Sequence, residues 1–333
     1  MRGYVLNGYG GPEKAELTDL RAPPPRPGQV QIRVRAAGLN PVDYKIREGK
    51  LKVITRYKLP IVLGNELAGD VELPGAGVSG FTKGDRVYAR VAKDKLGAFG
   101  DYATVDAKFL APIPHACSYE QAAAVPLAGL TALQCLRDEL NAGAGMNLLI
   151  TGGAGGVGSF AIPLAKWLGA TVTTTASPRG EALVRELGAD QVIDYTQQPL
   201  SDYSRQFDAA LDLVGNDLPA VFGSVRSGGK VVTIAGMPEP QTAKLDLQAN
   251  WKLSALFWFA SYGLRAKAKK FGVEYRYKFM HPSGSELAEL TQLINDEILP
   301  IKIDRSFPFD QIEQAFAYLE AGRAKGKVVV KMA

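Results

Sequence analysis

Residues 147–158 read NLLITGGAGGVG, an apolar run that leads directly into a glycine-rich turn. The next residues, SFAIPLAKWLG (159–169), have helical spacing, and TVTTT (171–175) has the β-branched composition of a strand. Strand, glycine loop, helix and strand in this order predict a dinucleotide-binding unit. The three glycines of the G-x-G-x-x-G spacing permit a tight turn, a close approach of the backbone to a pyrophosphate, and close packing of helix on strand.

The end of the second predicted strand distinguishes between the two nicotinamide cofactors. An NAD site places an acidic residue there, about 20 residues past the loop, where it binds the ribose 2′-hydroxyl. This chain has Ser177 and Arg179 at that place and no acid before Glu181. A hydroxyl and a guanidinium suit a 2′-phosphate, because arginine pairs with phosphate in a fork geometry. The sequence therefore favours NADPH over NADH, with a solvated loop carrying a surface arginine as the alternative.

Strands and helices go on alternating after the glycine loop, which predicts a parallel, doubly wound sheet. The stretches concerned are GEALVRELG (180–188), VIDY (192–195), AALDLVG (209–215) and KVVTIAG (230–236). Residues 1–125 differ, because short strands separated by turn residues predict a partly open antiparallel barrel. Those strands are QVQIRVRAAG (29–38), IVLGNELAGDVEL (61–73), GDRVYARV (84–91) and GDYATVD (100–106). A further pattern of helix, strand, helix and strand follows from about residue 282.

The composition excludes several classes of protein. A chain of 333 residues with 46% hydrophobic and 22% charged residues predicts about two globular domains. The net charge of +5 suits an anionic small molecule and falls short of a nucleic-acid-binding protein. No window reaches the roughly 18 apolar residues of a membrane span, and the N-terminus lacks the apolar core of a signal peptide. Two cysteines without CxxC spacing suit the cytoplasm, and two separated histidines disfavour a metal site.

Several longer motifs carry a family resemblance over nearly the full length. They are AAGLNPVDYKIREG (36–49), GNELAGDV (64–71), GDRV (84–87), GAFGDYA (97–103), AAAVPLAGLTAL (122–133), GGAGGVGSFAIPLAKWLGA (152–170), ELGADQVIDY (186–195) and GKVVVKM (326–332). In this order and spacing the chain resembles the medium-chain dehydrogenase/reductase superfamily, in its zinc-independent quinone oxidoreductase and enone reductase branch. The resemblance implies a GroES-like barrel domain over 1–125, completed by 283–333. It also implies an NADP-binding Rossmann domain over 126–282, with the active site in the cleft.

The positions of zinc ligands are the clearest departure from the zinc-dependent relatives. Those relatives carry a cysteine where this chain has Asn40, and the histidine of a Gly-His-Glu motif where it has Asn65. A third ligand, a cysteine, falls near Leu127. We therefore predict that no metal takes part.

The resemblance also implies a set of cofactor-binding residues. The expected contacts come from the glycine loop, the end of the second strand, the turns after the later strands, and the last strand. They are Thr131, Ala154, Gly155, Gly156, Val157, Ser177, Arg179, Tyr195, Leu213, Val214, Ala235, Gly236 and Lys327. For Tyr195 the alternative is core packing, and for Lys327 it is a charge at a strand edge.

Without a metal to polarise the acceptor, the substrate must already be an electrophile. A C=C bond conjugated to a carbonyl fits, since hydride adds to the β-carbon and charge grows on the carbonyl oxygen. Candidate catalytic donors are Asn40, Tyr44 and Lys45, although Tyr44 also suits a pocket wall and Lys45 a solvated charge. We predict an NADPH-dependent reductase of enals and enones. The alternatives are an NADPH:quinone reductase and, less favoured, a non-catalytic NADPH-binding or membrane-associated protein.

The segment 251–280 mixes aromatic and basic residues and admits three interpretations. Tyr275, Tyr277 and Phe279 alternate with charged residues, which predicts helix packing plus a half-buried edge strand that pairs across a homodimer. The other interpretations are the wall of a substrate pocket and a helix on a membrane surface.

Overall fold

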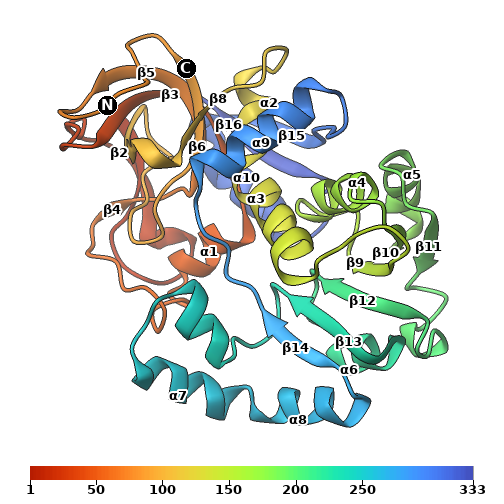
Figure 1. Ribbon diagram of the computed structural model, residues 1–333. Helices are drawn as coiled ribbons and strands as arrows, with labels where there is room; N and C mark the ends of the chain where they lie inside the picture. The colour runs from red at the N-terminus through yellow and green to blue at the C-terminus, as the bar shows by residue number, and fades with distance from the viewer. Residues whose placement is uncertain (333) are drawn as a thin grey trace. The chain divides into compact units, whose positions relative to one another are not determined.

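The computed structural model describes residues 1–332, which divide into two compact units (Figure 1). Unit 1 comprises Met1–Leu130 together with the chain from Pro282 onward, and unit 2 comprises Thr131–His281. Among the described residues, no helix is long and apolar enough to cross a membrane.

Unit 2 is built on a six-stranded parallel sheet of order β11-β10-β9-β12-β13-β14. Its strands are β9 (Asn147–Thr151), β10 (Thr171–Ala176), β11 (Gln191–Asp194), β12 (Phe207–Asp212), β13 (Val225–Thr233) and β14 (Glu274–Tyr277). Counted from β9, this is the order 3-2-1-4-5-6 of a dinucleotide-binding fold, and the direction of strand order reverses between β9 and β12. The doubly wound sheet predicted from the alternating pattern is therefore confirmed.

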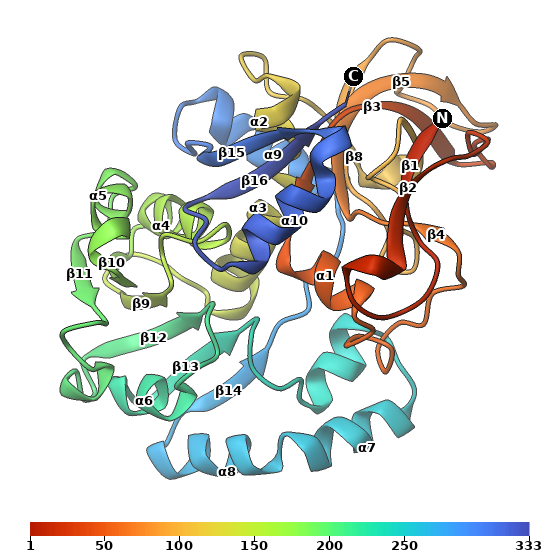
Figure 2. The ribbon, with the colours of Figure 1, turned by 180° about the vertical axis from the view of Figure 1, so that it is seen from behind.

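The helices of unit 2 lie between these strands in the sequence, except η3, which precedes β9 (Figures 1 and 2). They are α4 (Gly158–Trp167), α5 (Pro178–Glu186), α6 (Leu218–Ser224), α7 (Trp251–Ala260), α8 (Tyr262–Phe271), the π-helical η3 (Gln134–Glu139) and η5 (Thr242–Asp246), and the short η4 (Leu200–Asp202). Eight consecutive residues of α4 are buried, as the run GSFAIPLA allows. The helix α3 (Pro126–Leu133) crosses the boundary between the units.

Unit 1 is a curved, mainly antiparallel sheet of order β15-β16-β3-β5-β6-β8, with β7 pairing on β3. The strands are β3 (Gln29–Leu39), β5 (Glu66–Pro74), β6 (Arg86–Arg90), β7 (Tyr102–Asp106), β8 (Leu110–Pro112), β15 (Ile303–Pro308) and β16 (Lys327–Lys331). A small second sheet has the order β2-β1-β4, with β1 (Arg2–Leu6), β2 (Ala15–Asp19) and β4 (Ile61–Val62). The C-terminal strand β16 pairs antiparallel with β3, so the end of the chain completes the sheet of unit 1.

Unit 1 also has helices around this sheet: α1 (Pro41–Arg47), α2 (Tyr119–Ala123), α9 (Gly284–Asn295) and α10 (Ile312–Glu320), with short turns η1 (Pro12–Lys14), η2 (Ala107–Phe109) and η6 (Phe309–Gln311). The core beneath them is apolar and aromatic. Tyr4 and Phe99 pack on Phe316, with ring centroids 5.6 and 5.8 Å apart respectively.

Two expectations from the sequence are wrong in detail. The single strand predicted over 61–73 is divided into β4 and β5, because Gly64 has a φ of +101° and turns the chain. A Cβ at Gly64 would lie 2.6 Å from the backbone nitrogen of Phe99, so only glycine fits. The half-buried alternation predicted around residue 275 also fails, since Arg276 and Lys278 are as buried as Tyr275.

Candidate active site

The glycine loop follows β9, beside the reversal point of the sheet in unit 2. Gly152 takes a φ of +69°. A Cβ at Gly153 would lie 2.2 Å from Thr174 Oγ1, and one at Gly158 would lie 2.5 Å from the Gly153 carbonyl oxygen. A Cβ at Gly155 would lie 3.3 Å from the Gly152 carbonyl oxygen, a tight contact but a milder one than at the other two glycines. Glycine is therefore required at Gly153 and Gly158, where a side chain would collide with β10 and with the loop itself.

The amides of this loop form an anion-binding surface at the start of α4. Within the described chain, the backbone nitrogens of Ala154, Gly156 and Val157 donate no hydrogen bond. They precede a ten-residue helix, whose N-terminal dipole favours negative charge. A pyrophosphate fits this donor set.

Asp212, at the end of β12, joins the ends of three neighbouring strands. Its carboxylate accepts hydrogen bonds of 2.7 Å from Thr151 Oγ1 on β9 and from Thr233 Oγ1 on β13. It also accepts from the amide of Gly215, at 3.1 Å to Oδ2. The predicted cofactor residues Leu213 and Val214 therefore lie in a turn fixed by a buried carboxylate.

Further predicted cofactor residues gather around these strand ends. The Thr233 hydroxyl accepts from the amides of Ala235 and Gly236, both at 3.1 Å. A Cβ at Gly152 would lie 2.7 Å from Val214, so the glycine loop and the turn after β12 are adjacent. Thr131, also predicted, is buried in α3. Asp212 was not predicted as a site residue, because a lone aspartate at a strand end carries no spacing signal.

The residues expected near a 2′-phosphate lie at the end of β10 and beyond. Ser177 is the N-cap of α5, yet its hydroxyl caps no amide, and Arg179 is exposed in the first turn. A Cβ at Gly180 would lie 2.8 Å from that of Ala154, which places this helix start against the glycine loop. Tyr195, after β11, is 60% exposed, so the interpretation of it as a core residue is wrong.

Unit 1 holds a buried polar cluster at the place of the zinc-ligand motif. We call it the Lys327 cluster, and its members are Asn40, Asp43, Asn65, Glu66, Arg90 and Lys327, each less than 5% exposed. Lys327 lies on β16, between β15 and β3, so it is not at a strand edge. Its ammonium donates to Glu66 Oε1 at 2.7 Å, to Asn40 Oδ1, and to the Leu39 carbonyl at 3.2 Å.

Glu66 is the centre of this cluster. Besides Lys327 it accepts the Asn40 amide at 2.6 Å through Oε1 and the Leu127 backbone N–H at 2.6 Å through Oε2. A Cβ at Gly38 would lie 2.3 Å from Glu66 Oε1, so glycine in the AAGLN motif makes room for the carboxylate. The family resemblance identified the zinc-ligand positions at Asn65 and Leu127 but assigned no role to Glu66.

Asp43 occupies an electrostatically unfavourable position in the same cluster. It accepts the backbone N–H of Asn40 at 2.7 Å and the side-chain amide of Asn65 at 2.6 Å. Complete burial nevertheless raises the pKa of Asp43 to about 7, with these two hydrogen bonds opposing the rise. Burial also lowers the pKa of Arg90. Asn65 Oδ1 and Arg90 Nε are buried and have no hydrogen-bond partner in the described part of the chain.

This donor set does not fit a zinc ion. Asn40, Asn65 and Leu127 supply no thiolate or imidazole, and the Glu66 carboxylate, next to Asn65 in the motif, is neutralised by the Lys327 ammonium. Over residues 1–332 no three His, Cys, Asp or Glu side chains group as metal ligands. The two cysteines are buried, and burial raises the pKa of Cys135 to about 12.

The three predicted catalytic residues divide into two kinds. Both polar atoms of the Asn40 side chain are engaged within the Lys327 cluster, and the residue is 4% exposed, so it is a network residue rather than a free donor. Tyr44 and Lys45 follow on α1 and are half-buried. Neither side chain makes a hydrogen bond or ion pair with another described residue. Burial raises the pKa of Tyr44, so the phenol keeps its proton at neutral pH.

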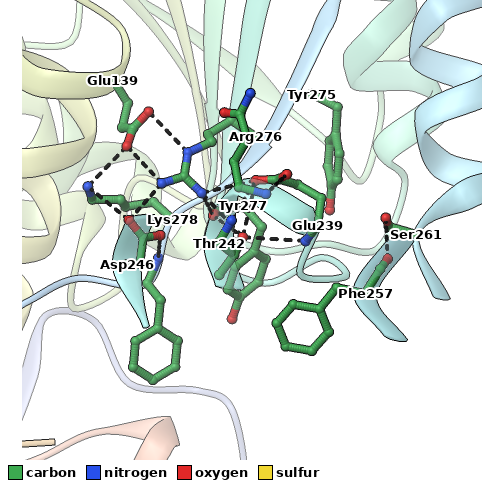
Figure 3. Close-up of polar contacts among 12 residues, drawn as sticks. Glu139, Glu239, Thr242, Asp246, Phe257, Ser261, Tyr275, Arg276, Tyr277 and Lys278 are labelled. Atoms are coloured by element: carbon green, nitrogen blue, oxygen red, sulfur yellow. Dashed lines mark hydrogen bonds and ion pairs between the residues drawn. The ribbon is translucent and has the colours of Figure 1, made fainter. Parts of the chain in front are cut away.

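A second buried cluster, in unit 2, contains only well-paired charges. We call it the Arg276 cluster, and its members are Glu139, Glu239, Asp246, Arg276 and Lys278 (Figure 3). The Arg276 guanidinium pairs with Asp246 at 2.7 Å, Glu239 at 3.0 Å and Glu139 at 3.1 Å, while Lys278 pairs with Glu139 at 3.0 Å. Burial opposes these charges, but the hydrogen bonds of Lys278 and Arg276 outweigh it and lower the pKa of Glu139.

Comparison with known proteins places this geometry in a family. Residues 26–115 match the alcohol dehydrogenase GroES-like domain, and residues 187–330 match the zinc-binding dehydrogenase domain. An NADPH-dependent alkenal/one oxidoreductase of Arabidopsis thaliana is 36% identical, covering 99% of this chain and 79% of its own length. The mitochondrial NAD(P)H oxidoreductase RTN4IP1 of Danio rerio is 32% identical over 100% of this chain and 91% of that protein.

A solved structure shows the same fold over the full length of the chain. The quinone oxidoreductase from Coxiella burnetii superposes with a TM-score of 0.86 at 31% identity, covering 100% of this chain and 99% of that one. A GroES-like unit and a dinucleotide-binding unit in one chain define the medium-chain dehydrogenase/reductase superfamily. This chain belongs to that superfamily, in its quinone oxidoreductase and enone reductase branch.

Proposed function

We propose that this chain is an NADPH-dependent oxidoreductase that reduces the activated C=C bond of α,β-unsaturated carbonyls without zinc. The observation that carries the proposal is the Lys327–Glu66 ion pair, which occupies the zinc-ligand motif with an internal cation. An acceptor that needs no Lewis acid suits such a site. The alkenal/one relative of Arabidopsis thaliana, named as NADPH-dependent, supports the same substrate class and cofactor.

The residues of unit 2 would hold the cofactor at three points. The free amides of Ala154, Gly156 and Val157 fit the pyrophosphate, and Ser177 and Arg179 fit the 2′-phosphate. The turn after β12, held by Asp212, fits the nicotinamide ribose. When bound, NADPH supplies a hydride, which adds to the β-carbon of the conjugated carbonyl.

The free donors of α1 would stabilise the negative charge that then grows on the carbonyl oxygen. The Tyr44 hydroxyl and the Lys45 ammonium have no competing partner among residues 1–332, so either can donate to that oxygen. Asn40 acts indirectly in this scheme, because it orients Glu66 and Lys327. We assign it, together with Asp43, to positioning.

The alternative function is NADPH:quinone reduction, which uses the same hydride. The likeness to a quinone oxidoreductase structure favours it as the second candidate. Steady-state NADPH oxidation with a panel of enals, enones and quinones separates the two. We expect turnover of enals and enones, and turnover of quinones alone would contradict the first choice. Tight NADPH binding without oxidation by any acceptor would show a non-catalytic binding protein.

Replacement of Tyr44 by Phe and of Lys45 by Met tests the donors. We expect each change to lower kcat by about 10- to 100-fold, because one charge-stabilising donor is lost in the transition state. The matched control is Lys58→Met, an exposed residue of the same unit, which should leave kcat unchanged. A kcat unchanged in both α1 variants would remove this helix from the chemistry.

Two further points stay predictions. The edge position of β14 supports a homodimer that forms by pairing of this strand with its copy, and sedimentation at several concentrations tests it. A cytoplasmic location, predicted from cysteine usage, is tested by fractionation of cells that contain the tagged chain.

A further inference from the structure

The helices α7 and α8 carry a concentration of exposed aromatic side chains. Trp251 is 75% exposed, Phe259 72% and Tyr262 58%. Trp258, 44% exposed, contacts both Phe259 and Tyr262, with ring centroids 4.9 and 5.8 Å apart. The helix packing expected for this segment is therefore wrong for these four residues, which form a contiguous apolar surface instead.

The same two helices carry the excess charge of the whole chain. Residues 251–271 hold five basic residues, Lys252, Arg265, Lys267, Lys269 and Lys270, and no acidic one. The chain has 39 basic and 34 acidic residues, a net charge of +5, so everything outside this segment is neutral in sum. We call residues 251–271 the basic aromatic segment.

The lysines and the aromatic rings both lie on the solvent-exposed side of the segment. Figure 1 draws α7 and α8 end to end, with Ser261 as the residue between them. At about 3.6 residues per turn, Trp251 and Trp258 lie on the same side of α7. Phe257, Ser261 and Ala268 are buried, whereas Trp251, Phe259 and Tyr262 are exposed. Lys267, Lys269 and Lys270 are exposed and pair with no acidic residue in the described chain.

Arg265 fixes the arrangement of the Trp258 ring. Its guanidinium lies 5.4 Å from the Trp258 ring centroid and donates to the Trp258 carbonyl at 2.8 Å and to Ser261 Oγ at 3.0 Å. Trp251 and Trp258 also line a groove of about 490 Å³, with Lys244 among its other walls. This volume is within the range of small-molecule pockets.

We propose that the basic aromatic segment docks unit 2 onto an anionic lipid surface. Tryptophan and tyrosine prefer the boundary between headgroups and acyl chains, and nearby lysines are attracted to anionic headgroups. Charge complementarity selects this occupant over a second copy of the chain, because two segments of +5 would repel each other. Peripheral contact of this kind needs no spanning helix.

Co-sedimentation of the full chain with lipid vesicles tests the proposal. The probes are vesicles of phosphatidylcholine alone and of phosphatidylcholine with about one third phosphatidylglycerol. We expect binding to the anionic vesicles at low salt, loss of that binding at high salt, and little binding to the neutral vesicles. In a Trp167→Phe background, the fluorescence of Trp251 and Trp258 should shift to shorter wavelength on binding.

A charge-matched pair of variants locates the surface. The change Lys267→Gln, Lys269→Gln and Lys270→Gln should weaken partition to anionic vesicles by about 100-fold, from about fivefold per lysine. The control, Lys14→Gln, Lys58→Gln and Lys108→Gln, removes the same charge from exposed sites of unit 1 and should keep binding within about threefold. Trp251→Ser with Phe259→Ser should remove the remaining binding at moderate salt.

Three results would overturn the proposal. They are no binding to anionic vesicles at low salt, equal loss in the two lysine variants, and a change of oligomeric state in the segment variants without a change in vesicle binding. The last result would identify a second copy as the occupant. NADPH oxidation with a water-soluble enone should be the same in both lysine variants, so this test is independent of the proposed function.

Discussion

The two buried charged clusters, one in each unit, are opposite in their electrostatic balance. In the Arg276 cluster, the three carboxylates pair with two cations at 2.7–3.1 Å, and the pKa of Glu139 falls while those of Arg276 and Lys278 rise. In the Lys327 cluster, the pKa of Asp43 rises to about 7, and Asn65 Oδ1 and Arg90 Nε lack partners among the described residues.

The difference separates a cluster that stabilises the fold from a cluster with the features of a functional site. A network whose charges are all paired stabilises the fold, and here it ties η3 and η5 to the edge strand β14. A network with unpaired polar atoms and a raised carboxyl pKa costs stability and is typical of a functional site. We therefore expect variants of the Arg276 cluster to change stability alone, and variants of the Lys327 cluster to change both stability and turnover.

The largest effect on stability is expected for Arg276→Met. The change leaves buried carboxylates at Glu239 and Asp246 without their main cation, so the free energy of unfolding should fall by about 3–5 kcal/mol. Denaturant unfolding measures it, and Arg276→Lys, which keeps the charge, should lose less. The kcat of the folded fraction should stay within about twofold of the original. A larger loss of kcat in the folded protein would show that the Arg276 cluster also contributes to turnover.

Lys327→Met should lower the free energy of unfolding less than Arg276→Met does, and should lower kcat more. Glu66 loses its cation but keeps two N–H donors, so we expect a loss of about 2–3 kcal/mol in unfolding free energy. The double variant Lys327→Met, Glu66→Gln removes both charges and should regain most of that stability without regaining kcat. Recovery of kcat together with stability would show that Lys327 contributes to stability alone.

The raised pKa of Asp43 gives a pH-dependent prediction. The folded state holds this proton up to about pH 7, whereas the unfolded chain releases it near its ordinary value of 3.8. The stabilising contribution of the protonated carboxyl is therefore complete at low pH and is lost as pH rises through this interval. Compared with Asp43→Asn, which stays neutral, the original chain should lose about 2 kcal/mol of unfolding free energy between about pH 5 and 7. A pH-independent difference would contradict the raised pKa.

The smallest effect on stability is expected for Arg179→Ala, since the side chain is exposed and unpaired in the part of the chain described. Affinity for NADPH should fall by about 10- to 50-fold, with NADH almost unchanged, because only NADPH has the 2′-phosphate. Kd values from cofactor fluorescence measure both. Equal losses for the two cofactors would mean that Arg179 does not contact that phosphate.

Local pattern was sufficient to predict the sheet of unit 2. The glycine loop and the alternation of strands and helices fix a parallel sheet, since each signal spans only a few residues. The Lys327 cluster was not predictable in the same way. Glu66 and Lys327 are 261 residues apart, and their contact depends on β16 pairing with β3. Sequence alone therefore identified Asn40 as a donor without showing that its amide is already engaged.

Burial of charge was the other feature that local pattern missed. Arg276 and Lys278 alternate with aromatic residues and therefore predict an exposed face of a strand. Their burial depends on carboxylates from η3 and η5, which no local rule brings to β14. Trp251 and Phe259 differ from expectation in the opposite direction. Their large apolar side chains predict burial, but both are exposed.

The most direct test of the account measures NADPH oxidation by an α,β-unsaturated ketone before and after exhaustive treatment with a metal chelator. We predict that the enone is reduced and that the rate is unchanged by chelation, because Lys327 supplies the cation of the motif. No turnover of any enone, or a rate that chelation abolishes and zinc restores, would contradict the account.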